Sequence, residues 1–136
     1  MDTVTRTSAE TMDAFFNAFG SGDIPAILDL FSDDSDFMVA GAPNVGWVGR
    51  RHGKAEIAEF FASFGQLLTA PEAFSISHKI VDGDEAVAIA RCVFGVLATG
   101  KKFDNSFALH LTVADGRITR YNMYENSFAI YQAFTP

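Results

Sequence analysis

The second half of the chain contains four stretches of alternating apolar and polar residues separated by very short turns. The expected strands cover residues 74–81, 85–97, 102–113 and 117–125. The turns between them contain Gly83, Gly100 and Gly116. Turns this short join neighbouring strands as antiparallel hairpins. The pattern therefore predicts one antiparallel sheet made of consecutive strands.

The first half of the chain has a helical period instead. Thr7 and Glu10 have the spacing of a capping box, and the apolar residues after them recur every three or four positions up to the glycines at 20 and 22. Asp23 begins a second expected helix, and a third runs from Lys54 to about Leu68. A short strand is expected at 36–40, and a last helix follows Asn126. Helices and strands segregated in this way indicate an α+β fold.

A chain of 136 residues predicts a single domain over residues 1–136. Its few helices must cover one face of the sheet, and a sheet that curls beneath them encloses an apolar cone. The 14 Phe residues suit such an interior. An apolar pocket with a few polar groups is the default place for a small apolar ligand.

Charge and composition exclude several classes of partner. A net charge of −7 argues against nucleic acid, and no cluster of Lys or Arg or long apolar run points to a membrane. The N-terminus lacks the apolar core of a signal peptide, so a cytoplasmic protein is expected. His52, His78 and His110 have no metal-ligand spacing, and no phosphate or dinucleotide motif is present. We therefore expect neither metal nor cofactor.

Two segments resemble a known family. Residues 46–61, GWVGRRHGKAEIAEFF, resemble the loop and third helix of SnoaL-like proteins, which belong to the NTF2-like superfamily. Residues 114–134, ADGRITRYNMYENSFAIYQAF, resemble the last hairpin and closing helix of that family. The resemblance implies a cone in which a curved antiparallel sheet is covered by three helices from the N-terminal half and a short C-terminal helix. It also implies a homodimer.

The ketosteroid isomerases of this superfamily use a Tyr, a carboxylate base and a protonated Asp. By the resemblance, these positions fall on Phe15, Val39 and Leu109, which are all apolar. Steroid-type isomerisation by that triad is therefore not expected.

Alternation along the strands indicates which side chains face the cone. The expected ligand pocket consists of Phe15, Phe19, Val39, Trp47, Phe61, Cys92, Phe94, Phe107, Leu109 and Met123. The polar side chains on the same side are Asn105, Tyr121 and Glu125. The opposite side, expected to make the dimer contact, carries Arg91, His110, Asn122 and Tyr124.

Glu125 is the main acid/base candidate, because a carboxyl group inside an apolar cone has a raised pKa. In SnoaL-like cyclases an acidic residue near this strand end is assigned to proton transfer, and here either Glu125 or Asn126 could take that place. Alternatively, Glu125 is a charge at the start of the next helix. Tyr121 and Asn105 are candidates to stabilise a substrate oxygen. Alternatively, Tyr121 only lines the pocket, and Asn105 binds backbone.

Three functions follow from these alternatives. A cavity with Glu125 inside favours proton-transfer chemistry on an apolar, carbonyl-bearing substrate, of the isomerase, cyclase or dehydratase type. A cavity without an ionisable group favours a non-catalytic binding module. A filled core with an exposed apolar groove favours a protein-interaction domain.

Overall fold

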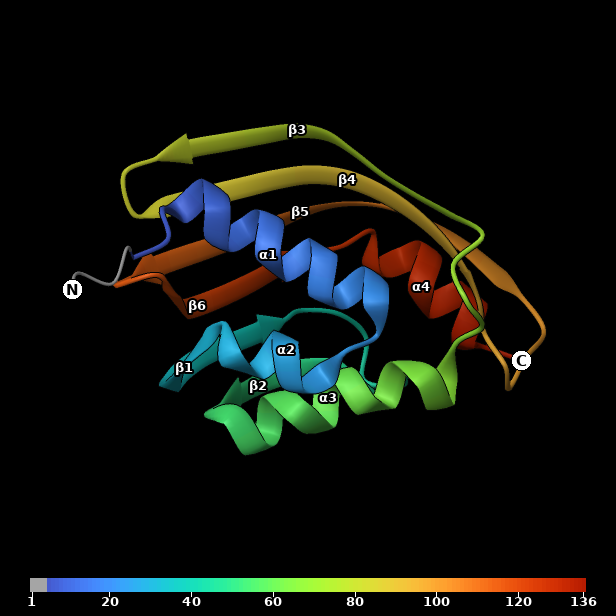
Figure 1. The fold of residues 1–136 in the computed structure, drawn as a ribbon. Coiled ribbons are helices and arrows are strands. Elements are labelled where there is room, and N and C mark those ends of the chain that lie inside the picture. The colour runs from blue at the N-terminus through green and yellow to red at the C-terminus, as the bar shows by residue number, and fades with distance from the viewer. Residues whose placement is uncertain (1–4) are drawn as a thin grey trace.

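The computed structural model describes residues 5–136, which form one bent six-stranded sheet and four helices (Figure 1). The helices are α1 (Ser8–Ser21), α2 (Ile24–Asp29), α3 (Lys54–Leu67) and α4 (Ser127–Phe134). The strands are β1 (Phe31–Val39), β2 (Gly49–His52), β3 (Ala73–Asp82), β4 (Glu85–Gly95), β5 (Lys102–Ala114) and β6 (Arg117–Tyr124). The expected α+β architecture is confirmed.

The strands follow the order β2-β1-β6-β5-β4-β3 across the sheet. The three consecutive pairs from β3 to β6 are antiparallel, as their short turns predict. By contrast, β1 runs parallel to β6, so the sheet is not wholly antiparallel. The two strands are far apart in sequence, and no tight turn constrains their relative direction.

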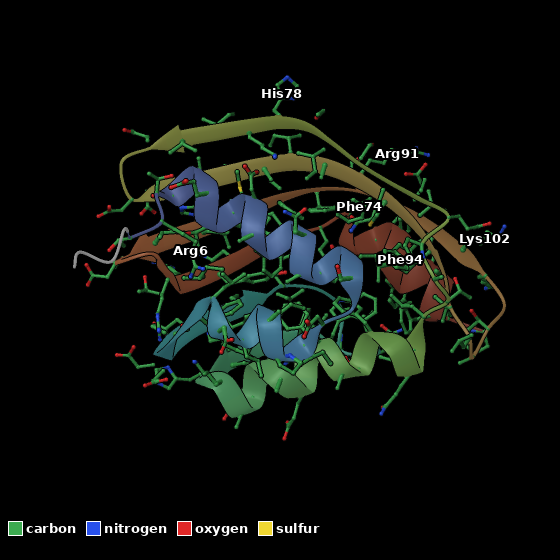
Figure 2. The ribbon with its side chains drawn as sticks, viewed as in Figure 1. Arg6, Phe74, His78, Arg91, Phe94 and Lys102 are labelled. Carbon is green, nitrogen blue, oxygen red and sulfur yellow. The ribbon has the colours of Figure 1, made fainter. Side chains whose placement is uncertain are left out.

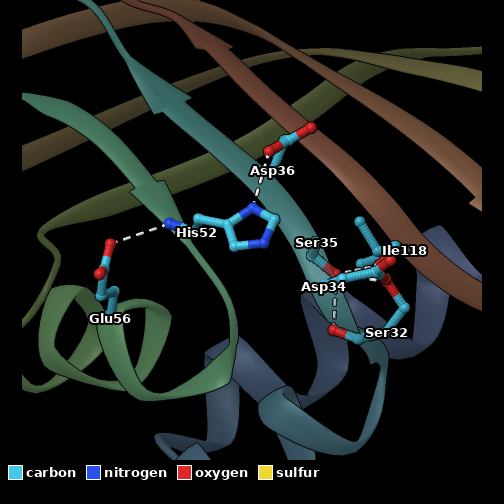
Figure 3. A network of polar contacts seen from close by, with 7 residues as sticks. All are labelled: Ser32, Asp34, Ser35, Asp36, His52, Glu56 and Ile118. Atoms are coloured by element: carbon cyan, nitrogen blue, oxygen red, sulfur yellow. Dashed lines mark hydrogen bonds and ion pairs between the residues drawn. The ribbon is translucent and has the colours of Figure 1, made fainter.

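Two expectations about this end of the sheet were wrong. The strand expected at 36–40 begins at Phe31, and β2 forms where a loop was expected before α3. The early start of β1 includes polar residues, with a shift in pairing to β6 between Phe31 and Asp36. Within that shift, buried Ser35 places its Oγ 2.7 Å from the Ile118 carbonyl oxygen of β6 and 2.8 Å from Ser32 Oγ (Figure 3). The side-chain hydroxyl thus replaces a regular backbone pairing.

The helix ends follow local sequence chemistry. The Thr7 hydroxyl accepts a hydrogen bond from the Glu10 N–H at 3.1 Å, and the Glu10 carboxylate accepts one from the Thr7 N–H at 2.9 Å. This capping box begins α1, and Gly22 ends it with a φ of +67°. Asp23 then accepts from the Ala26 N–H and begins α2. All three features agree with the expectation from sequence.

Aromatic packing joins the helices to the concave face of the sheet. The Tyr121 ring of β6 stacks on Phe37 of β1, with centroids 4.1 Å apart and planes 5° apart. Phe60 of α3 meets Phe37 at 4.6 Å, and Phe15 of α1 meets Tyr121 at 5.7 Å. The helices α1, α2 and α3 lie on this face, and α4 packs against β5 at one end of it (Figure 1).

The other side of the sheet is largely exposed and mixes polar side chains with exposed apolar ones such as Ile89 and Tyr124. Figure 2 shows Phe74 and Phe94 on the helix side, and His78, Arg91 and Lys102 on the opposite side. Arg91 forms a two-pronged ion pair with Asp104 across β4 and β5, at 2.7 and 2.8 Å. Within residues 5–136, no helix has the length and apolar character needed to cross a membrane.

Gly65 provides a test of the packing around α3. No heavy atom lies within 4 Å of the position that a Cβ would occupy there, and its φ is not positive. Gly65→Ala should therefore raise the free energy of unfolding by about 0.5–1 kcal/mol, because alanine loses less backbone entropy in a helix. Gly22→Ala is the control and should lower stability, since its φ of +67° strains an alanine. Urea denaturation measures both, and a destabilised Gly65→Ala protein would contradict this packing.

Candidate functional site

The concave face encloses a small apolar cavity with a free volume of about 50 Å³, room for roughly three or four water molecules. Side chains from α1, α3, β3, β4, β5 and β6, together with the loop before β2 and the segment after β6, surround it. We call this space the inner cavity. It is lined by Phe15, Phe16, Phe19, Trp47, Phe64, Leu68, Phe74, Cys92, Phe94, Phe103, Asn105, Phe107, Leu109, Tyr121, Met123 and Glu125.

Glu125 is the one acidic side chain among the described residues that line the inner cavity, and no Lys or Arg lines it. Burial raises the pKa of its carboxyl group to about 7, because the apolar walls disfavour the charged form. The Trp47 indole N–H donates a long hydrogen bond of 3.4 Å to Glu125 Oε2 and partly opposes that rise. The carboxyl group is therefore poised to exchange a proton near neutral pH.

The structure separates the roles of Glu125 and Asn126. The Asn126 side chain accepts a hydrogen bond from the Ala129 N–H and begins α4, whereas the Glu125 side chain lines the cavity. Asn105 Oδ1 accepts a hydrogen bond of 2.8 Å from the Asn126 backbone N–H. Asn105 thus holds the backbone directly after Glu125, and its carbonyl oxygen is already engaged. Its amide nitrogen lies 3.8 Å from Cys92 Sγ.

Tyr121 offers a hydroxyl at the same cavity. The residue is only 2% exposed and lines the cavity with its side chain. Burial raises the pKa of Tyr121, and the negative charge of Glu125 raises it further, which shows that the two groups are close enough to interact. The hydroxyl therefore stays protonated and can donate to an oxygen atom of a ligand.

Arg51 anchors the backbone of Trp47. The Arg51 guanidinium donates a hydrogen bond of 2.7 Å to the Trp47 carbonyl oxygen and lies 5.0 Å from the centre of the Phe60 ring. Trp47 itself is 1% exposed and contacts Phe64 and Phe134. The loop before β2 is thus anchored to α3 and α4, which positions the indole N–H at Glu125.

Cys92 is buried and forms part of the cavity wall. Burial raises the pKa of its thiol to about 12, so the thiolate is scarce at neutral pH. Cys92 therefore contributes to the wall as a small hydrophobic residue.

Most of the expected pocket residues are brought together at the inner cavity, including Asn105, Tyr121 and Glu125. Two are not. Val39 is fully buried in β1 and does not line the cavity, and α3 packs on that strand, as the Phe37–Phe60 contact shows. Phe61 lies behind Phe15, with ring centroids 5.9 Å apart, and does not reach the cavity.

Five further lining residues were not on the expected set: Phe16, Phe64, Leu68, Phe74 and Phe103. Phe103 could have been found by alternation, since it shares its face of β5 with Asn105 and Phe107. Phe74 carried no such signal, because its approach to the cavity depends on the bend of β3.

The histidines lie away from the cavity. On the polar side of β1 and β2, His52 Nδ1 is 3.0 Å from Asp36 Oδ1, and the His52 N–H donates to Glu56 (Figure 3). The hydrogen bond to Asp36 raises the pKa of His52. Within residues 5–136, no group of three or more His, Cys, Asp or Glu side chains is arranged to hold a metal ion.

Comparison with known proteins places this geometry in a family. The SnoaL-like domain model matches residues 12–121. The uncharacterized protein YesE of Bacillus subtilis is 26% identical over 132 residues, covering 93% of this chain and 86% of YesE. A proposed isomerase of known structure from B. subtilis is 25% identical, with a TM-score of 0.78 over 93% of this chain and 91% of that one. An NTF2-like protein from Burkholderia thailandensis has a TM-score of 0.85 at 19% identity, over 96% and 99% of the two chains, and supports the fold alone.

The bent sheet, its covering helices and the enclosed apolar cavity define a protein of the NTF2-like fold. This chain belongs to the SnoaL-like family within it. The expected membership of the SnoaL-like family is thereby confirmed.

The pKa of Glu125 gives a direct test of the cavity. We expect its carboxyl group to titrate at about 7 in carbon-13 NMR, well above the ordinary 4.5. Trp47→Phe should raise this pKa further, because the indole N–H stabilises the charged form. A pKa at or below 4.5 would show that the carboxyl group is solvated and that the cavity is not closed around it.

The same shift makes stability depend on pH. An unfolded chain ionises Glu125 near 4.5, whereas the folded protein does so at about 7, so the folded state binds more protons between these values. The contribution of Glu125 to stability should therefore fall by about 3 kcal/mol as the pH rises from 4 to 8. Glu125→Gln should remove this fall. Urea denaturation across that pH range compares the two proteins, and parallel stability curves would contradict the expectation.

Proposed function

We propose that this chain is a SnoaL-like enzyme that moves a proton on an apolar, carbonyl-bearing substrate, with Glu125 as the acid/base and Tyr121 as the donor to the carbonyl oxygen. The observation that carries the proposal is the placement of both groups at one apolar cavity, with no cation beside the carboxyl group within the described residues. Similarity to a proposed isomerase from B. subtilis supports the reaction class.

The proposed step follows from the chemistry of these two groups. The Glu125 carboxylate takes a proton from the carbon next to the substrate carbonyl, and the electron pair of that C–H bond forms the enolate. The negative charge develops on the oxygen, where the Tyr121 hydroxyl donates a hydrogen bond. The protonated Glu125 then returns the proton to carbon, at the same or a neighbouring position. A carboxyl group with a pKa of about 7 serves in both directions at neutral pH.

A second candidate is a binding module that holds the ligand unchanged. The observation that favours it is the apolar character of Phe15, Val39 and Leu109, the positions at which ketosteroid isomerases carry their catalytic groups. Both candidates use the same cavity, and they differ only in whether Glu125 exchanges protons with the ligand.

Hydrogen exchange into a model ketone separates the two candidates. We expect the wild-type protein to accelerate the exchange of α-hydrogens of 2-pentanone for deuterium in D₂O, followed by proton NMR. Glu125→Gln keeps the shape of the side chain and should lower this rate by about 10²–10⁴. The rate should rise with pH through about 7 and then level off, because the carboxylate is the base.

Tyr121→Phe is the companion variant and should also slow the exchange, since the enolate oxygen loses its donor. Circular dichroism verifies that both variants are folded. Equal rates for the wild type and Glu125→Gln, or a wild-type rate no higher than that of buffer, would contradict catalysis and favour the binding module.

A further inference from the structure

A second hollow lies outside the inner cavity and is much larger, with a free volume of about 680 Å³. It runs between the C-terminal end of α1, α2, the second half of α3 and the residues 68–71 that lead to β3. We call it the outer groove. Its walls include Phe61, one of the two expected pocket residues that do not line the inner cavity.

The outer groove is apolar in an acidic protein. Among residues 5–136, no charged side chain lines it. Its two hydroxyl groups are already engaged within the fold: Ser21 donates to the Asn17 carbonyl oxygen, and Thr69 donates to the Ala70 carbonyl oxygen and accepts from the Gly95 N–H. A peptide in this groove would bring one N–H and one C=O per residue with few partners to meet them. A hydrocarbon tail has no such requirement.

The groove and the inner cavity share walls. Six residues line both spaces: Phe16, Phe19, Phe64, Leu68, Phe74 and Phe94. The two spaces therefore adjoin along these side chains. A molecule that binds with one end at Glu125 and extends past these shared walls would continue into the groove.

The two volumes also constrain the ligand. About 50 Å³ accepts a small end group but no large ring or chain, whereas the groove is more than ten times larger. Burial of the ligand's apolar surface in the groove would stabilise the complex by about 25 cal/mol for each Å² removed from water. A ligand that fits both spaces is elongated, with a narrow polar end and an uncharged hydrocarbon remainder.

We propose that the outer groove binds the hydrocarbon tail of an elongated ligand whose carbonyl end enters the inner cavity. The identity of the carbonyl end rests on the proposed function, whereas the tail site rests on the groove itself. The substrate class is thus a ketone with a long apolar chain rather than a compact ring or a phosphorylated compound.

A series of methyl ketones tests the tail site. The series 2-pentanone, 2-heptanone and 2-nonanone keeps the carbonyl end constant and lengthens the chain. Trp47 is the only tryptophan of the chain and lines the inner cavity, so its fluorescence reports binding of the carbonyl end. In the wild type we expect the affinity to increase about fourfold for each added methylene group that the groove buries.

Filling the groove should abolish this increase. Gly65 and Ala62 are exposed on the groove side of α3, and no heavy atom lies within 4 Å of a Cβ at position 65. Gly65→Phe should weaken 2-nonanone at least tenfold and leave 2-pentanone within twofold of the wild type. Ala62→Phe repeats the test one turn earlier. Gln66→Phe is the matched control: the residue is exposed on the same helix but does not line the groove, so it should change neither affinity.

Each outcome decides the proposal. A wild-type affinity independent of chain length, or an increase unchanged in Gly65→Phe and Ala62→Phe, overturns it. A wild-type dimer that sedimentation shows to dissociate in both variants would mean that a second copy of the chain occupies the groove, and also overturns it. Glu125→Gln separates this proposal from catalysis: if the variant keeps the chain-length dependence while proton exchange never depended on Glu125, the tail site stands and the enzyme proposal falls.

Discussion

The structure depends on the packing of aromatic rings against the concave face of one bent sheet. Phe37 and Tyr121 stack across two parallel strands, and rings from α1 and α3 cover them. This packing excludes water from the helix side of the sheet. The same exclusion raises the pKa of Glu125, so the packing that holds the fold together also prepares the acidic group that lines the inner cavity.

A single hydrogen bond then determines where that acid lies. The last β5–β6 pair joins Ala108 to Tyr124, and beyond it the chain turns into α4. The Asn105 side chain of β5 accepts a hydrogen bond from the Asn126 N–H and so fixes this turn relative to β5. Glu125 directly precedes Asn126, and its side chain lines the cavity. Asn105 is therefore a positioning residue. Its side-chain carbonyl oxygen is bound to the Asn126 N–H, so replacing Asn105 would change the position of Glu125 and would not remove a contact of that oxygen with the ligand.

This arrangement differs from that of the ketosteroid isomerases within one superfamily fold. By the resemblance, their catalytic positions fall on the apolar residues Phe15, Val39 and Leu109, whereas the acidic group at the cavity follows the last strand and accepts a hydrogen bond from Trp47. The fold provides an apolar cone in either case, and the chemistry depends on which polar side chains line it. The small inner cavity and the large outer groove further suit a slender molecule.

Local sequence patterns determined the four helices and the inward faces of β4, β5 and β6, but not the start of β1 or the presence of β2. The Thr7 cap, the Asn126 cap and the inward direction of Glu125 follow from steric rules that act over a few residues. Tertiary structure alone decided the parallel pairing of β1, the exclusion of Val39 from the cavity and the arrival of Phe74 at its wall. The free volume of the cavity and the desolvation of Glu125 both depend on many side chains that are distant in sequence. No single segment specifies them, and they exist only once the sheet has bent around the helices.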